Sequence, residues 1–424
     1  MKSIRNSKFV VNFFSLASVQ LLNYVLPLIT MPYLVLVLGI ENYGLVGFAQ
    51  AVMQYFILVT DYGFNITATQ QISVNRDKPG RIEKIYSTVL ICKLILLALC
   101  LVILLGMIVL IPKLRENPGL YLLMFGIVVG NVFLPIWFFQ GIEEMKNIGL
   151  LNFVSKLIFT IGLFIFVKNQ QDIQKVALLN SFGYIVVGMV AVLIVRFKYQ
   201  IKFQRIAFNE IIEQFKSSWH LFISNIATSV YTTTNIFVLG ILVGDRATGY
   251  FNLANTLIRA CASIATPITQ TFYPRVASLA TTSKEESLKI IRKIWMVVTA
   301  LFSVGCLILL FGTGPILTLF FGNKFDHSLL LIQIMSFLPL MVAWGNVYGI
   351  LTMTTFGYQK QLSKIYLIAG CISLVSIIVL TSLFQAVGTA INAMIIETLV
   401  TVLLIAFVNK KGISISKGTI KTLE

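Results

Sequence analysis

Apolar runs long enough to cross a bilayer recur along the whole chain, separated by short polar segments. A helix of about 20 apolar residues matches the hydrocarbon thickness of a membrane, and only helices and closed barrels satisfy their backbone there. The pattern therefore predicts an all-α integral membrane protein. Twelve spans are expected, at residues 9–38, 43–64, 85–111, 119–140, 148–167, 176–195, 217–242, 249–272, 294–320, 328–352, 365–384 and 386–408.

Positive charge concentrates on one side of the predicted spans. With the N-terminus in the cytoplasm, the cytoplasmic segments hold 24 Lys and Arg residues, whereas the opposite loops hold 6. This asymmetry predicts that both termini are cytoplasmic, in agreement with an even number of spans. The net charge of +17 is thereby explained by topology, so nucleic-acid binding is not expected.

The chain compared with itself at an offset of 205 residues shows an internal repeat. Gly39 and Gly44 match Gly244 and Gly249, and both segments follow an odd-numbered span. A repeat with the same orientation predicts two six-helix lobes related by a pseudo-two-fold axis along the membrane normal. The expected lobes are 1–200 and 217–424. The basic, amphipathic segment between them, 201–216, is expected either along the headgroups or as a solvated linker.

Polar residues form stripes on four of the predicted spans. Steps of 3, 4 and 7 residues keep each stripe on one helix face, and a polar face turned to lipid is costly. Interhelical hydrogen bonds would explain any single amide, but stripes in repeat-related pairs favour a water-filled cavity. The amides expected to line it are Gln50, Gln54, Asn252, Asn255, Asn23, Asn225 and Asn235.

Ionisable residues inside spans are candidates for function, because charge at membrane depth is costly. Arg259 lies within a stripe and suits an anionic headgroup, since guanidinium binds phosphate bidentately; an ion pair with Glu397 or Asp61 is the alternative. Lys93 and Lys156 either make the cytoplasmic mouth of the cavity positive or snorkel to the interface. Glu397 is a candidate for proton or cation coupling, and Asp61 for capping or gating.

The sequence does not favour catalysis. It has no Walker-type phosphate loop, and its two histidines lack metal-ligand spacing, so neither a cofactor nor a metal is expected. The predicted outside loops are short, which argues against a membrane-embedded glycan enzyme. A transporter is the favoured class.

Four motifs carry a resemblance that covers essentially the whole chain. They are the Gly39–Gly44 segment followed by FAQ, WFFQGIEEM at 137–145, VGDRATGYFNLAN at 243–255 and FYPRVA at 272–277. In this order they resemble the multidrug/oligosaccharidyl-lipid/polysaccharide (MOP) exporter superfamily, and within it the Wzx-type flippases of O-antigen and capsule repeat units.

The resemblance implies a bacterial inner-membrane flippase without a cofactor. Its cargo would be an undecaprenyl-pyrophosphate-linked glycan, moved from the inner to the outer leaflet by alternating access, with ion coupling typical of such exporters. Arg259, with Lys93 and Lys156, would meet pyrophosphate or acidic sugars. Membrane lipid, a polysaccharide polymerase and a chain-length regulator are the implied partners. A drug/cation antiporter is the rival, disfavoured because the first span holds no acidic residue.

Overall fold

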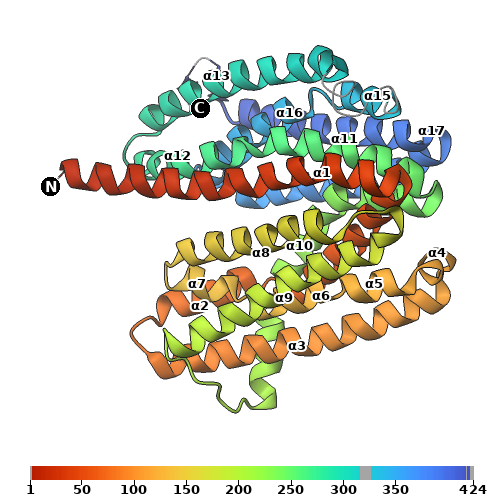
Figure 1. Cartoon of the computed structure of the whole chain (residues 1–424). Coiled ribbons are helices and arrows are strands. Elements are labelled where there is room, and N and C mark those ends of the chain that lie inside the picture. Colours follow the sequence, from red (N-terminus) through yellow and green to blue (C-terminus); the bar gives the residue numbers. More distant parts are fainter. Residues whose placement is uncertain (1, 316–325, 417, 421–424) are drawn as a thin grey trace. The chain divides into compact units, whose positions relative to one another are not determined.

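The computed structural model describes residues 2–315, 326–416 and 418–420, and these are almost entirely helical (Figure 1). Side chains before residue 25, and at several positions of α10, lie outside the description. The helices of the first half are α1 (Lys2–Asp61), α2 (Phe64–Val74), α3 (Pro79–Leu110), α4 (Pro112–Glu116), α5 (Pro118–Met124), α6 (Gly126–Phe133), α7 (Ile136–Gly141), α8 (Met145–Phe166), the 3₁₀ turn η1 (Gln170–Asp172) and α9 (Ile173–Phe197).

The second half continues in the same way and ends in a small hairpin. Its elements are α10 (Phe208–Leu242), α11 (Asp245–Ser263), α12 (Ala265–Thr282), α13 (Lys284–Leu307), the π-helix η2 (Ile308–Gly312), α15 (Asp326–Ile334), α16 (Leu338–Gly345), the π-helix η4 (Asn346–Thr354), α17 (Gln359–Lys410), β1 (Ile413–Ser414) and β2 (Thr419–Ile420). Strands β1 and β2 pair antiparallel.

Eight helical stretches among the described residues are long and apolar enough to cross a membrane. Two of them are double: α1 changes direction at Gly39 (φ 80°) and α17 at Gln385 (φ 52°). The predicted seventh and eighth spans lie on α10 to α12, which are helical but more polar. The all-α, multi-pass prediction is confirmed, and residues 316–320 of the ninth predicted span lie outside the described residues.

The two glycines that match in the repeat have the same backbone role. Gly39 (φ 80°) and Gly244 (φ 117°) both have positive φ immediately before a helical segment. Glycine adopts this conformation without the steric cost that a Cβ atom would impose. The repeat thus marks corresponding helix junctions, while the symmetry axis itself stays a prediction.

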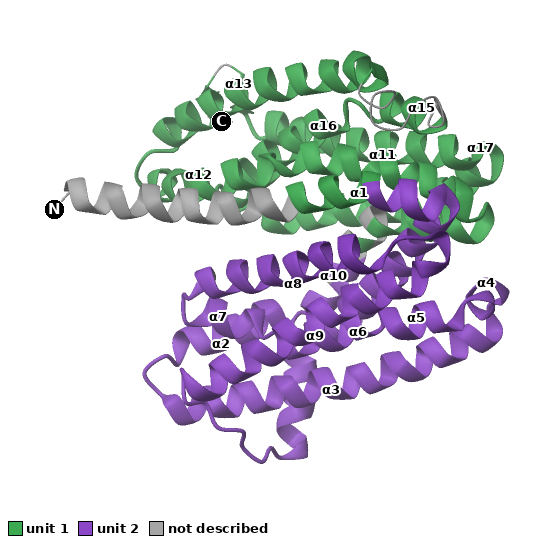
Figure 2. Cartoon of the chain, in the orientation of Figure 1, with its two compact units in different colours: residues 1–32, 227–424 green, residues 33–226 purple. Residues whose placement is uncertain are grey.

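The chain forms two compact units, coloured separately in Figure 2. Unit 2 is residues 33–226, and unit 1 is residues 1–32 together with 227–424. These boundaries differ from those of the predicted lobes because both of them fall inside a helix. The first lies after residue 32, within α1, and the second after residue 226, within α10.

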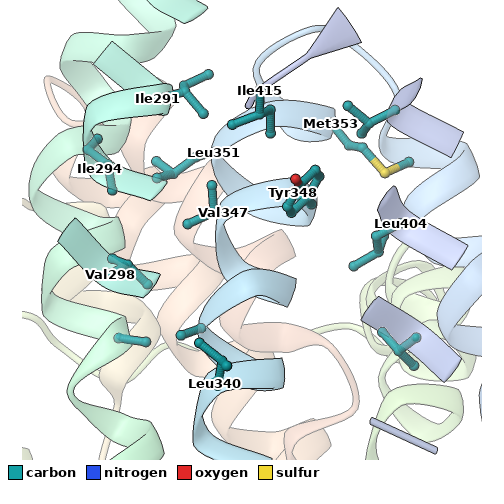
Figure 3. Close-up of a cluster of buried hydrophobic side chains, with 14 of the residues drawn as sticks. Ile291, Ile294, Val298, Leu340, Val347, Tyr348, Leu351, Met353, Leu404 and Ile415 are labelled. Atoms are coloured by element: carbon teal, nitrogen blue, oxygen red, sulfur yellow. The ribbon is translucent and has the colours of Figure 1, made fainter. Parts of the chain in front are cut away.

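Each unit has its own apolar core. In unit 2, aromatic residues of α7 pack against α2 and α3, and Trp137, Phe138 and Phe139 are almost completely buried. In unit 1, α13, α16, η4 and α17 bury aliphatic side chains against one another (Figure 3). Ile415, beyond the end of α17, is 1% exposed in the same cluster, so the C-terminal segment is part of that core.

Glycines allow α6 and α9 to approach closely within unit 2. A Cβ atom on Gly130 would lie 2.3 Å from the carbonyl carbon of Tyr184, and one on Gly188 would lie 2.6 Å from the Gly130 oxygen. Small residues at helix contacts are typical of membrane proteins, where close van der Waals packing replaces the hydrophobic effect.

The segment predicted as a linker docks onto helix α3. The carboxylate of Glu83 accepts hydrogen bonds from the Lys202 backbone N–H (2.9 Å) and from the Gln204 side-chain amide (2.7 Å). Ile201 is buried in the core of unit 2. Residues 201–207 therefore form a non-helical, anchored segment, and α10 begins at Phe208, inside the expected linker.

Candidate functional site

A buried ion pair lies within the helices of unit 2. Asp61 ends α1, Lys93 lies midway along α3, and the Lys93 Nζ is 2.9 Å from the Asp61 Oδ1. The Lys93 side chain is 1% exposed and that of Asp61 is 22% exposed. Lys93 therefore pairs with a carboxylate inside the protein. The sequence predicted instead that it would snorkel to the interface or make the mouth of a cavity positive. The attraction between the two charges offsets the cost of removing each of them from water, whereas a single buried charge would have no such compensation.

The turn after Asp61 explains how the carboxylate is placed. Tyr62 (φ 42°) and Gly63 (φ 79°) both have positive φ and separate α1 from α2. The Tyr62 ring stacks on Phe222 at 4.3 Å and meets Phe215 edge-on at 5.0 Å. This aromatic contact with α10 holds the turn, and with it the end of α1. The Asp-Tyr-Gly sequence was the available signal for a turn at this place.

The glutamines of the second predicted span lie on the exposed side of α1. Gln50 and Gln54 are exposed, whereas Phe48 and Met53 between and beside them are buried. These two amides thus lie on the side of α1 away from the buried residues Phe48 and Met53. Lys156, on α8 of the same unit, is half-buried.

The second polar stripe is on α11 in unit 1 and centres on Arg259. The Arg259 Nε donates a hydrogen bond to the Asn255 Oδ1 at 3.1 Å, one helical turn away. Arg259 is exposed, and Asn252 and Asn255 are half-buried on the same stripe. Glu397 of α17 lies within electrostatic range of the guanidinium. The sequence offered Glu397 and Asp61 as ion-pair partners for Arg259. Glu397 is within electrostatic range of it, whereas Asp61 pairs with Lys93.

Asn235 has a different environment from the other predicted amides. It is 6% exposed, and its Oδ1 accepts a hydrogen bond from the Asn392 Nδ2 at 3.2 Å. Ser376 donates to the Asn392 Oδ1 at 2.5 Å, so the three side chains link α10 with both parts of α17. This is interhelical hydrogen bonding within unit 1. Asn392 and Ser376 were missed because neither belongs to a repeated stripe.

Two predicted residues complete the set. Asn225 is half-buried on α10. The side chain of Asn23 lies outside the described residues.

The two units differ in how their charged side chains are used. Asp61 and Lys93 are paired inside the helices of unit 2, whereas Arg259 is exposed beside two asparagines. A guanidinium offers a planar set of N–H donors that matches phosphate oxygens, and amides both donate to and accept from hydroxyl groups. Chemically, the α11 stripe suits an anionic, hydroxyl-rich ligand better than a cation.

Comparison with known proteins places the chain in a family. Residues 9–280 match the family described as "Polysaccharide biosynthesis protein". The chain belongs to this family. It is 36% identical over 397 residues to a protein named "Putative O-antigen transporter" from Escherichia coli (strain K12), covering 94% of this chain and 96% of the relative. A protein of the same name from Shigella dysenteriae is 29% identical, covering 90% and 96%.

Solved structures of the MOP superfamily share the fold. The lipid II flippase MurJ in an inward closed conformation aligns with a TM-score of 0.70 at 14% identity, covering 95% of this chain and 87% of that one. An inward-facing MATE multidrug transporter aligns with a TM-score of 0.64 at 13% identity, covering 96% and 98%. The chain therefore has the same fold as these solved flippase and transporter structures.

Proposed function

We propose that the protein is a flippase that moves an undecaprenyl-pyrophosphate-linked oligosaccharide, of O-antigen or capsule type, from the inner to the outer leaflet. Membership of the polysaccharide biosynthesis family supports a glycan cargo, as do relatives named O-antigen transporters. The observation that carries the proposal is the exposed Arg259 on the amide-bearing face of α11. A phosphate-binding side chain beside sugar-binding amides matches the two parts of such a cargo.

In this proposal the site is exposed alternately to the two sides of a bacterial inner membrane, and both termini are cytoplasmic. In unit 1, Arg259 binds the pyrophosphate and Asn252 and Asn255 bind the glycan. In unit 2, Gln50 and Gln54 are proposed as glycan-binding amides. Glu397, within electrostatic range of Arg259, is proposed as the coupling residue, because a carboxylate beside the cargo-binding cation can respond to both a cation and the cargo.

Asp61 and Lys93 are proposed to gate through their ion pair, and Lys156 to add positive charge near the cytoplasmic side. A polymerase and a chain-length regulator are proposed as the proteins that act on the exported unit.

The experiment is deletion of the gene followed by analysis of surface polysaccharide and of lipid-linked intermediates. The proposal predicts loss of the polymer and accumulation of single lipid-linked units on the cytoplasmic face. Complementation with Arg259→Ala should fail at normal protein levels, Arg259→Lys should restore part of the polymer, and Arg275→Ala, an exposed arginine on α12, should restore all of it. Normal glycan combined with drug sensitivity in the deletion strain would instead favour an antiporter.

A further inference from the structure

A polar pocket lies in unit 2, away from the residues proposed to bind cargo. It has a volume of about 390 Å³ and is formed by the end of α2, the start of α3 and the start of α10. Its charged and amide side chains include Arg81, Lys84, Glu210, Glu213 and Gln214. By the distribution of Lys and Arg, this end of the helices is the cytoplasmic one.

The pocket contains a buried amide with unused hydrogen-bonding capacity. Gln214 is 6% exposed, and its Oε1 accepts a hydrogen bond from the Gln71 Nε2 at 3.2 Å. Its Nε2 is buried and has no partner in the part of the chain that the structure describes. An unpartnered buried N–H group is costly, so a ligand oxygen in the pocket would remove a penalty that the empty pocket carries.

Charges of both signs line the same pocket. Lys84 and Glu210 form an ion pair, but the second carboxylate oxygen of Glu210 is buried and unpartnered among the described residues. Arg81 and Glu213 are exposed at the rim. The glutamates also suit the N-terminus of α10, where negative charge is favourable. Stabilisation of the helix N-terminus accounts for the glutamates but not for the pocket or for the positive charge of Arg81 in its lining. A ligand with one anionic and one cationic group would match both kinds of charge.

The position of the pocket indicates where such a ligand comes from. Arg81 and Lys84 immediately precede the apolar part of α3, and Thr88 at the pocket wall is already within it. Large apolar side chains within two residues of the lining residues Asn75 and Glu210 are exposed, namely Val74 (77%) and Phe208 (72%). Polar and exposed apolar groups side by side are typical of the level of lipid headgroups.

We propose that this pocket binds the headgroup of phosphatidylethanolamine from the cytoplasmic leaflet. The phosphate accepts hydrogen bonds from Arg81 and from the free N–H of Gln214, while the ammonium donates to Glu213 and to the unpartnered oxygen of Glu210. The acyl chains lie along the exposed apolar surface of unit 2. This site is independent of the cargo and of the function proposed above.

The test is native mass spectrometry of the full-length, delipidated protein with phosphatidylethanolamine, phosphatidylcholine and phosphatidylglycerol of identical acyl chains. The first phosphatidylethanolamine should bind roughly tenfold more tightly than the other two lipids, because each lacks the ammonium N–H donors. Arg81→Ala should weaken its binding roughly tenfold, while the matched control Lys78→Ala, an exposed lysine outside the pocket, should not.

The preference for the amine is tested separately. Glu213→Gln should bring phosphatidylethanolamine and phosphatidylglycerol to similar affinities, whereas the control Asp77→Asn should keep the wild-type difference. Equal binding of the three lipids by the wild type, or unchanged binding in Arg81→Ala and Glu213→Gln, would overturn the proposal. Competition by soluble glycerophosphoethanolamine as strong as that by the intact lipid would also overturn it, because the ligand would then not be a membrane lipid.

Discussion

The ion pair between Lys93 and Asp61 permits a quantitative test of how charge is held inside unit 2. The perturbation is Lys93→Met, which keeps most of the side-chain volume and removes the charge, alongside Asp61→Asn and the double variant. Breaking a buried pair by removing one partner costs about 3–5 kcal/mol, because the remaining charge is buried without compensation.

The exposure of the two side chains sets an order between the single variants. After Lys93→Met, the carboxylate of Asp61, which is 22% exposed, still reaches water, so a loss near 3 kcal/mol is expected. After Asp61→Asn, the ammonium of Lys93 is 1% exposed and has lost its counter-charge, so a loss near 5 kcal/mol is expected. The double variant buries no charge, so its loss should be smaller than that of either single variant and far below the sum of the two.

The assay is the free energy of unfolding of the purified protein, obtained by titrating mixed micelles with a denaturing detergent. Lys156→Met is the control, since Lys156 is a half-buried lysine of the same unit. Strict additivity, in which the double variant loses the full sum of both single losses, would refute the reasoning. A greater loss in Lys93→Met than in Asp61→Asn would refute the order derived from exposure.

Three further predictions concern the packing of each unit. Gly130→Ala should destabilise the protein by about 1–3 kcal/mol through overpacking, measured by thermal unfolding, whereas Gly106→Ala should have little effect because its added Cβ meets no atom within 4 Å. Glu83→Ala should release the anchored segment 201–207, seen as faster tryptic cleavage after Arg205; unchanged cleavage would contradict the anchor. Asn392→Ala should cost about 0.6–1.7 kcal/mol in the same unfolding assay, and no loss would show that its amide contacts are not stabilising.

Much of the fold follows from the sequence because the bilayer imposes one dominant rule. Apolar length predicts the helices, and paired glycines predict the junctions at Gly39 and Gly244, since a positive φ favours the residue that lacks Cβ. The break at Gln385 was predicted only as a short turn, and it is a single residue with φ 52°. The anchoring of residues 201–207 was not predicted, because it depends on Glu83, a residue far away in sequence.

The candidate site was less accessible to prediction than the fold. Helical spacing predicts that Gln50 and Gln54 share one side of their helix, and both are exposed, as is Arg259. That these side chains line a cavity stays a prediction. Spacing does not say which polar residue meets which, so the Lys93–Asp61 pair and the Asn235–Asn392 hydrogen bond were not predicted. Both depend on contacts between helices distant in sequence, which a single sequence does not encode in any local pattern.

The most direct test of the proposed function is translocation of a lipid-linked oligosaccharide by the purified protein in proteoliposomes. The measured quantity is the fraction of glycan accessible to a membrane-impermeant glycosidase over time, with cargo supplied in the inner leaflet. The account predicts a rising accessible fraction with the wild type, a slower rise with Arg259→Lys and the protein-free rate with Arg259→Ala. Wild-type translocation by Arg259→Ala, or a protein-free rate with the wild type, would contradict it.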